Sequence, residues 1–219
     1  MATGTDSVVV YAETNFLVAA VFPHREDHYP ANSLLNSGIR IKIPQVAKFE
    51  SRSAIRNAVR DLSNQVKQSR AILDALRETR IASLNSDTFL QLMTELETYA
   101  REDFDRRLAD VIANPALEWL QSDVETFALA DRLFLETNLS HGDMWDAQIL
   151  ASILNDAKRL PVNTPRLFMS RNKREFQEGQ DKKLPSAFYV PYRMVYVDGF
   201  DIDHGMRLWE RQYVSQGKG

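Results

Sequence analysis

Residues 7–22 read SVVVYAETNFLVAAVF, and this stretch decides the fold class. Its first part, residues 7–12, is a continuous apolar run rich in β-branched side chains, which is typical of a strand buried on both faces. Its last part, residues 15–22, has helical spacing and stops before Pro23, because proline disfavours the helical conformation in the preceding residue. Between them stands Glu13, a carboxylate at the end of a core strand, where a charge needs partners.

The order of strand followed by helix recurs along the chain. Further strands are predicted at residues 39–43, 165–170 and 193–197, each followed by a segment with helical spacing or a short turn. This alternation predicts an α/β fold with a central, mostly parallel sheet of about four to five strands and right-handed crossovers. The middle of the chain is predicted to be all helix. We therefore expect residues 1–219 to form a single domain with a helical insertion at approximately 52–136.

The composition limits where the protein acts and which metals it can hold. The chain has no cysteine, which excludes disulfides and thiolate ligands, so a metal would need oxygen or histidine ligands. No apolar run approaches the roughly 20 residues of a membrane span, and the N-terminus does not have the pattern of a secretory signal. We expect a cytoplasmic protein without a membrane partner. The net charge of −3 argues against binding nucleic acid through bulk charge.

The charge is distributed unevenly along the predicted helices. Residues 48–80 contain eight Lys or Arg against four Asp or Glu, whereas residues 81–136 contain four Arg against twelve acids. This asymmetry indicates either a local anionic partner or two helical faces that pack on each other. Arg52, Arg56 and Arg60 recur at four-residue spacing and form a stripe, which either tracks a nucleic-acid backbone or is a solvated or acid-paired face.

Several carboxylates are expected at one edge of the sheet, because ligands of open parallel sheets bind beyond the carboxyl ends of the strands. Glu13 follows the first strand, and Glu50 lies two turns into the helix after the second. Asp143 and Asp146 lie in the first turns of the helix before the third strand, and that strand is followed by Ser170, Asn172 and Glu175. Neighbouring carboxylates raise each other's pKa, and a divalent cation removes this cost. With oxygen ligands alone, the cation would be Mg²⁺ or Mn²⁺.

Four segments resemble the PIN-domain nucleases in their order and context. Residues 8–18, VVVYAETNFLV, resemble the first strand of that family and its turn of acid, Thr or Ser, and Asn. Residues 41–51, IKIPQVAKFES, resemble the second motif, in which a proline begins a helix and an acid follows. Residues 146–154, DAQILASIL, resemble the third, and residues 167–176, LFMSRNKREF, resemble the fourth. The intervening helical stretch resembles that of larger bacterial members with a helical insertion.

The resemblance implies a three-layer α/β/α sandwich and hydrolysis of RNA phosphodiester bonds by a metal-activated water. It implies that Glu13, Glu50 and Asp146 hold Mg²⁺ or Mn²⁺, and that Asn15 and Ser170 orient these ligands. The expected products carry a 5′-phosphate and a 3′-hydroxyl. The expected partner is single-stranded or structured RNA. If the chain is a toxin of a toxin–antitoxin pair, an antitoxin protein is a further expected partner. The resemblance also implies a homodimer, because many members of the family self-associate.

The chain departs from the family pattern at two positions. The first acid is Glu13 where the family usually has Asp, and the extra methylene moves the carboxylate by roughly 1.5 Å. Asn172 stands where a fourth Asp is common in the family. Asn is a neutral ligand, and Glu175 is the candidate to supply the missing carboxylate. Asp143 is a second candidate on the third motif's helix, but it also fits a capping box with Ser140 as the N-cap.

These departures leave other functions open. One alternative is a catalytically degenerate PIN-like module that binds RNA or a protein, and another is a structure-specific DNA nuclease. In the nuclease interpretation, Arg171, Lys173 and Arg174 follow the third strand closely and are candidates for contacting phosphates, together with the stripe that begins at Arg52 and Arg56. Glu50 also has a plain structural interpretation as a solvated or ion-paired helix residue.

Overall fold

A five-stranded, all-parallel sheet forms the centre of the computed structural model, which describes residues 8–23, 25–78, 86–136, 144–177 and 188–215. The strands are β1 (Val9–Ala12), β2 (Ile41–Pro44), β3 (Leu117–Leu120), β4 (Arg166–Ser170) and β5 (Met194–Asp198). Their order in the sheet is β3-β2-β1-β4-β5, and every neighbouring pair is parallel. The predicted α/β class with a central parallel sheet is therefore confirmed.

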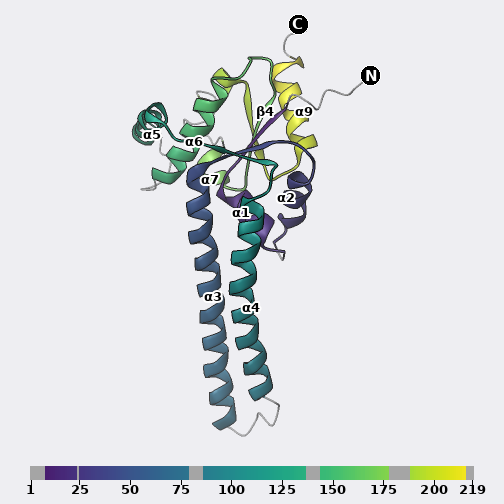
Figure 1. Cartoon of the computed structure of the whole chain (residues 1–219), viewed down its shortest axis with the longest axis vertical. Helices are drawn as coiled ribbons and strands as arrows, with labels where there is room; N and C mark the ends of the chain where they lie inside the picture. The colour runs from purple at the N-terminus through teal and green to yellow at the C-terminus, as the bar shows by residue number, and fades with distance from the viewer. Residues whose placement is uncertain (1–7, 24, 79–85, 137–143, 178–187, 216–219) are drawn as a thin grey trace.

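Helices connect the strands and cover both faces of the sheet. They are α1 (Thr14–Val21), α2 (His28–Leu35), α3 (Gln45–Glu78), α4 (Ser86–Ile112), α5 (Val124–Glu136), α6 (Met144–Ala157), α7 (Lys173–Phe176), the 3-10 helix η1 (Val190–Tyr192) and α9 (Ile202–Tyr213). Figure 1 shows α5 and α6 on one side of the sheet and α9 on the other. Among the helices described, none combines the length and apolar character that crossing a membrane requires.

Alternation along β1 divides the core into two layers, because successive side chains of a strand point to opposite faces. Val10 and Ala12 belong to the core that includes residues of α1, α2 and α9. Tyr11 belongs to the other core, which it shares with α6 and with Phe168, its register partner on β4. The sheet is thus buried on both faces, as the apolar run of residues 7–12 predicts, and the fold has three layers.

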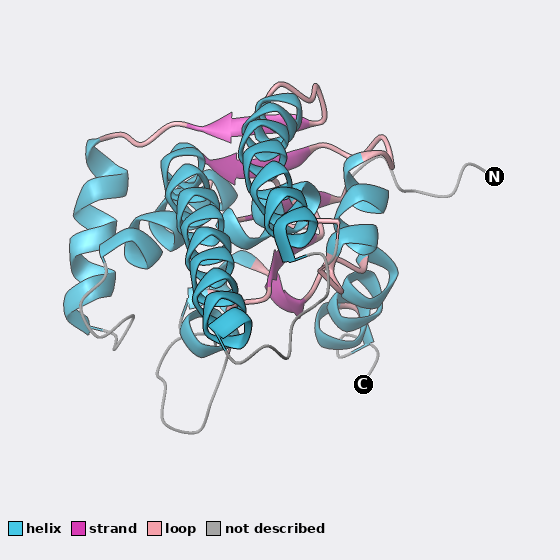
Figure 2. Ribbon diagram, turned by 90° about the horizontal axis from the view of Figure 1, so that it is seen from below, coloured by secondary structure: helices cyan, strands magenta, loops and turns pink. Residues whose placement is uncertain are grey.

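The helices α3 and α4 form an antiparallel hairpin that projects beyond the sheet (Figures 1 and 2). Both helices contact α1, and buried residues such as Ile55 and Leu108 join the core. With a rise of 1.5 Å per residue, the 34-residue α3 is roughly 51 Å long. Most of this hairpin lies within residues 52–136, the range in which a helical insertion is predicted.

The prediction of helix throughout residues 52–136 is wrong at β3. Leu117 to Leu120 pair with Ile41 to Pro44 as the edge strand of the sheet. The sequence Asn114-Pro115 followed by apolar residues at helical spacing is a normal helix start, but Leu117 and Leu120 are both buried against the core. Pairing with β2 and this burial override a local helical preference that is weak in so short a segment.

Candidate active site

The carboxyl ends of the neighbouring strands β1 and β4 lie side by side, and the chain segments that leave them run to opposite sides of the sheet. The chain leaves β1 toward β2 on one side, and leaves β4 toward β5 on the other. In open α/β sheets, this divergence creates the crevice in which ligands bind. Here the hydroxyl of Ser170, at the end of β4, donates a 2.7 Å hydrogen bond to Oε1 of Glu13, which directly follows β1.

Glu13 is a buried carboxylate, with only 3% of its surface exposed. Besides the Ser170 hydroxyl, its Oε2 accepts a 2.9 Å hydrogen bond from the backbone N–H of Asn15, so Glu13 is the N-cap of α1. Burial raises its pKa to about 7, and the negative charge of Glu50 contributes in the same direction. The hydrogen bonds from Asn15 and Ser170 act against this rise but do not cancel it.

Glu50 is brought to the same place by α3. The hydroxyl of Thr14, the first residue of α1, donates a hydrogen bond to Oε2 of Glu50. Thr14 is buried and Glu50 is half-buried. Two carboxylates from separate elements therefore meet at this edge, and a short turn of acid, Thr and Asn holds both. The predicted residues Glu13 and Glu50 are thus brought to one edge of the sheet, and the backbone N–H of Asn15 and the hydroxyl of Ser170 both contact Glu13.

Ser170 is fixed as firmly as Glu13. Its side chain is fully buried, and its hydroxyl oxygen accepts a 2.8 Å hydrogen bond from the backbone N–H of Asn172. Its carbonyl accepts hydrogen bonds from the Tyr196 hydroxyl at 2.9 Å and from the backbone N–H of Gly199 at 3.1 Å. Asn172 therefore contributes through its backbone, and its side chain makes no capping hydrogen bond to α7.

The other acids predicted for the site are Asp146, Glu175 and Asp143. Asp146 lies in the first turn of α6 and is half-buried. Because α6 returns the chain to the start of β4, that first turn lies toward the carboxyl edge of the sheet. Glu175 is buried on α7, and its Oε1 lies 3.4 Å from Nε of Arg174. Asp143 lies outside the described residues.

A divalent cation fits the chemistry of the two carboxylates that do meet. A buried carboxyl group whose pKa is raised by burial and by a second carboxylate is relieved when a cation shares the site. The donors Glu13 and Glu50 are oxygens, which suits Mg²⁺ or Mn²⁺. Within the residues that the structure describes, no group of three or more Asp, Glu or His side chains is gathered closely enough to hold a metal.

Cationic side chains surround this edge. Arg171 follows β4 directly, and its Nη1 lies 3.6 Å from Oδ1 of Asp198, while Nζ of Lys173 lies 2.6 Å from Oδ2 of the same residue. Arg25 was not predicted as a site residue. Its hydrogen bond to Asp27 raises its pKa most, and the charges of Asp27 and Glu13 contribute in the same direction. The predicted phosphate contacts Arg171 and Lys173 therefore lie at the site edge, held by an acid at the end of β5.

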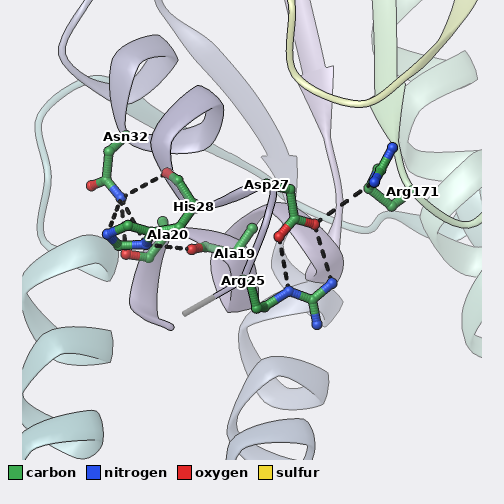
Figure 3. Close-up of polar contacts among 7 residues, drawn as sticks. All are labelled: Ala19, Ala20, Arg25, Asp27, His28, Asn32 and Arg171. Atoms are coloured by element: carbon green, nitrogen blue, oxygen red, sulfur yellow. Dashed lines mark hydrogen bonds and ion pairs between the residues drawn. The ribbon is translucent and has the colours of Figure 1, made fainter. Parts of the chain in front are cut away.

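Asp27 links two of these cations, as Figure 3 shows. Its carboxylate accepts hydrogen bonds from Arg25 Nε at 2.9 Å and Nη2 at 3.1 Å, and it lies 3.9 Å from Nε of Arg171. Asp27 is 6% exposed, and its pKa is lowered by Arg25 in spite of its burial. The sequence offers no local signal for this residue, because the stretch around it has no motif spacing.

The position of Asp27 depends on how α2 docks against α1 (Figure 3). The last carbonyls of a helix have no partner within that helix. Nδ1 of His28 lies 2.8 Å from the carbonyl oxygen of Ala19, and Nδ2 of Asn32 donates to the carbonyl of Ala20 at 3.2 Å. These contacts satisfy the end of α1 and fix the turn that carries Asp27.

Comparisons with known proteins add no family to this description. No protein-family model matches the chain, and no curated protein matches it either.

Proposed function

We propose that the chain is a metal-dependent endoribonuclease of PIN-like type. The observation that carries this proposal is the pairing of Glu13 and Glu50 at the divergence point of a parallel sheet, where the hydroxyls of Ser170 and Thr14 hold them. A buried carboxylate beside a second, half-buried one is costly for a fold that does not use them. The raised pKa of Glu13 and the oxygen-only chemistry of both side chains suit a catalytic cation.

Glu13 and Glu50 hold the cation in this proposal, and Asp146 is the proposed third ligand from α6. When bound, Mg²⁺ or Mn²⁺ supplies a water of lowered pKa and neutralises charge on the phosphate. Arg25, Arg171 and Lys173 attract the phosphodiester and orient it at the edge. Asn15 and Ser170 keep the carboxylate of Glu13 in place, since positioned ligands are what a metal site requires.

Substitution of Asp146 by Asn tests the proposal. We expect Asp146→Asn to abolish Mg²⁺- or Mn²⁺-dependent cleavage of single-stranded RNA, with an unchanged circular dichroism spectrum. Asp131→Asn on the exposed face of α5 is the matched control and is expected to cleave normally. Undiminished cleavage by folded Asp146→Asn would overturn the assignment. Parallel assays on single-stranded RNA and flap DNA separate a ribonuclease from a structure-specific DNA nuclease.

A second candidate function is a catalytically degenerate module that binds RNA or a protein. It is favoured by the absence of a three-residue metal group among the described side chains, and by Glu where the family pattern has Asp. Calorimetry with Mn²⁺ at pH 8 distinguishes the two functions. Binding that disappears in Glu13→Gln supports the enzyme, whereas no binding at millimolar Mn²⁺ supports the degenerate module.

A further inference from the structure

One face of α3 carries four cations that begin next to Glu50 and continue along the hairpin. Arg52, Arg56, Arg60 and Lys67, here called the basic stripe, are separated by four, four and seven residues, which places them on one side of a helix. All four side chains are exposed. Because α3 starts directly after β2, the stripe leads from the candidate active site outward.

Among the side chains that the structure describes, no acid of α4 forms an ion pair with the basic stripe. In the part of the chain that the structure describes, none of its four cations forms an ion pair, although α4 packs against α3. Asp103 of α4 is buried and pairs instead with Arg106 and Arg107 of its own helix. The charge asymmetry has two explanations, a local anionic partner or the pairing of two helical faces. The ion pairs described for α4 lie within that helix and do not support the pairing of helical faces.

A groove runs along the outer part of the stripe. It has a volume of about 380 Å³ and lies between α3 and α4. Arg56, Arg60 and Lys67 line it, with Asp105 as the acid among its lining residues, and the buried side chains of Ile55 and Val59 form an apolar floor. A positively charged groove with an apolar floor suits a polyanion that also has flat apolar faces.

An exposed aromatic side chain stands at the inner end of the stripe. Phe49 is 58% exposed, precedes Glu50 and lies three residues before Arg52, so it shares the face of the stripe. An exposed ring beside a cationic track is the arrangement on which unpaired bases stack. Four residues advance about 6 Å along a helix, close to the separation of neighbouring phosphates in an extended single strand.

We infer that the basic stripe and its groove bind the backbone of a single-stranded RNA that extends from the candidate active site along the hairpin. This inference rests on the proposed function. It adds the direction in which the bound RNA leaves the candidate active site and the length of RNA that the protein contacts. From Arg52 to Lys67 the stripe spans roughly 22 Å. The RNA therefore needs several unpaired nucleotides on one side of the cleaved bond, with a base stacked on Phe49. A duplex does not satisfy this, because its bases are already stacked.

Charge reversal at the outer end of the stripe tests the inference. We expect the full-length Arg60→Glu/Lys67→Glu variant to bind a labelled 15-nucleotide single-stranded RNA at least tenfold more weakly, by fluorescence anisotropy in EDTA. The slope of log affinity against log salt should fall by about 1.4, since about 0.7 is lost for each phosphate contact. Arg60→Gln/Lys67→Gln is expected to give a smaller loss in the same direction. Arg207→Glu/Arg211→Glu on α9 has the same charge change and is expected to bind within twofold of wild type.

The outcomes separate this inference from the proposed function. If Arg60→Glu/Lys67→Glu binds RNA as wild type does while Asp146→Asn abolishes cleavage, the stripe is not an RNA track and the nuclease stands. If wild type never cleaves but the stripe variant loses binding, the track stands and the nuclease fails. A poly-glutamate peptide that binds the stripe more tightly than RNA of equal charge would instead identify a docking surface for an acidic protein and overturn the inference.

Discussion

Ser170 Oγ lies 2.7 Å from Glu13 Oε1, and this hydrogen bond joins two residues that are 157 positions apart in sequence. The bond links the carboxyl ends of the neighbouring strands β1 and β4. At this edge the chain leaves β1 toward β2 on one side and leaves β4 toward β5 on the other. Because both side chains are buried, the bond connects the core of the fold to the proposed chemistry. Changes at either residue should therefore affect stability and activity together.

The pH dependence of stability should report the carboxyl group of Glu13. Its pKa is about 7 in the folded chain against an ordinary value of 4.5, so the folded state binds this proton more tightly than the unfolded state. The associated stability is fully present below about pH 4.5 and is lost as the pH rises through 7. By pH 8 the loss is on the order of 3 kcal/mol. Urea unfolding in EDTA between pH 4.5 and 8 measures it.

Glu13→Gln is the matched variant for this titration. It should show a flatter stability profile between pH 4.5 and 8, because it has no charge to bury. Mg²⁺ should raise the stability of wild type at pH 8 and leave Glu13→Gln unchanged. Parallel profiles for the two proteins would show that Glu13 does not titrate in this range.

Ser170→Ala should weaken the junction of β1 and β4. The substitution removes the donor to Glu13 and the acceptor for the N–H of Asn172, so we expect a stability loss of about 1–3 kcal/mol. A double-mutant cycle with Glu13→Ala, which leaves no acceptor for the Ser170 hydroxyl, should give a coupling energy of about 1 kcal/mol or more at pH 8. Strict additivity would mean that the hydrogen bond contributes nothing to stability.

Thr14→Val should loosen Glu50 without changing the shape of the buried side chain. Valine lacks the hydroxyl that donates to Glu50, and loss of such a supporting contact typically weakens metal binding about 10- to 100-fold. Thr14→Ser keeps the hydroxyl and should stay within about threefold of wild type. Calorimetry with Mn²⁺ measures both affinities, and equal weakening in the two variants would point to packing instead.

Asp27→Asn should lower RNA cleavage by releasing Arg25 and Arg171 from their shared anchor. We expect kcat/KM to fall about tenfold, a size typical of lost charged hydrogen bonds. The loss should appear mainly in KM if these arginines bind the phosphodiester. Full activity in Asp27→Asn would exclude a positioning role for Asp27.

Asp123→Asn is the control for a structural acid and carries its own pH prediction. Asp123 accepts hydrogen bonds from the N–H and hydroxyl of Thr126 at the start of α5, and these lower its pKa to about 2. Its contribution to stability is present above about pH 4 and is lost as the pH falls toward 2. Acid unfolding of Asp123→Asn should therefore be less steep than that of wild type, with unchanged cleavage at neutral pH.

The sequence was sufficient to predict that Glu13 and Ser170 lie at the same edge of the sheet. Glu13 and Ser170 each follow an apolar run, and parallel strands bring such ends together, so their meeting follows from local patterns. Asp27 and Arg25 could not be found in this way. Their placement depends on α2 docking against the carbonyl end of α1, a contact between His28 and Ala19 that no local spacing encodes.

Two further features required the three-dimensional structure. β3 is strand because it pairs with β2 and buries Leu117 and Leu120, whereas its local sequence also permits helix. Whether the basic stripe pairs with α4 depends on the rotation of one helix against the other, which the 3.6-residue repeat alone does not fix. Asp103 pairs with Arg106 and Arg107 of its own helix, and the four cations of the basic stripe are exposed.

The separation of Glu13 and Ser170 also sets the order of events during synthesis. β1 can pair with β2 once residue 44 has emerged from the ribosome, but β4 becomes available only after residue 170 has emerged. Until then Glu13 at the end of β1 does not have the Ser170 hydroxyl as a hydrogen-bond donor. Closing a loop of this length is also slow, because contacts distant in sequence form late. The candidate active site is thus incomplete until residue 170 of the 219 residues has been translated.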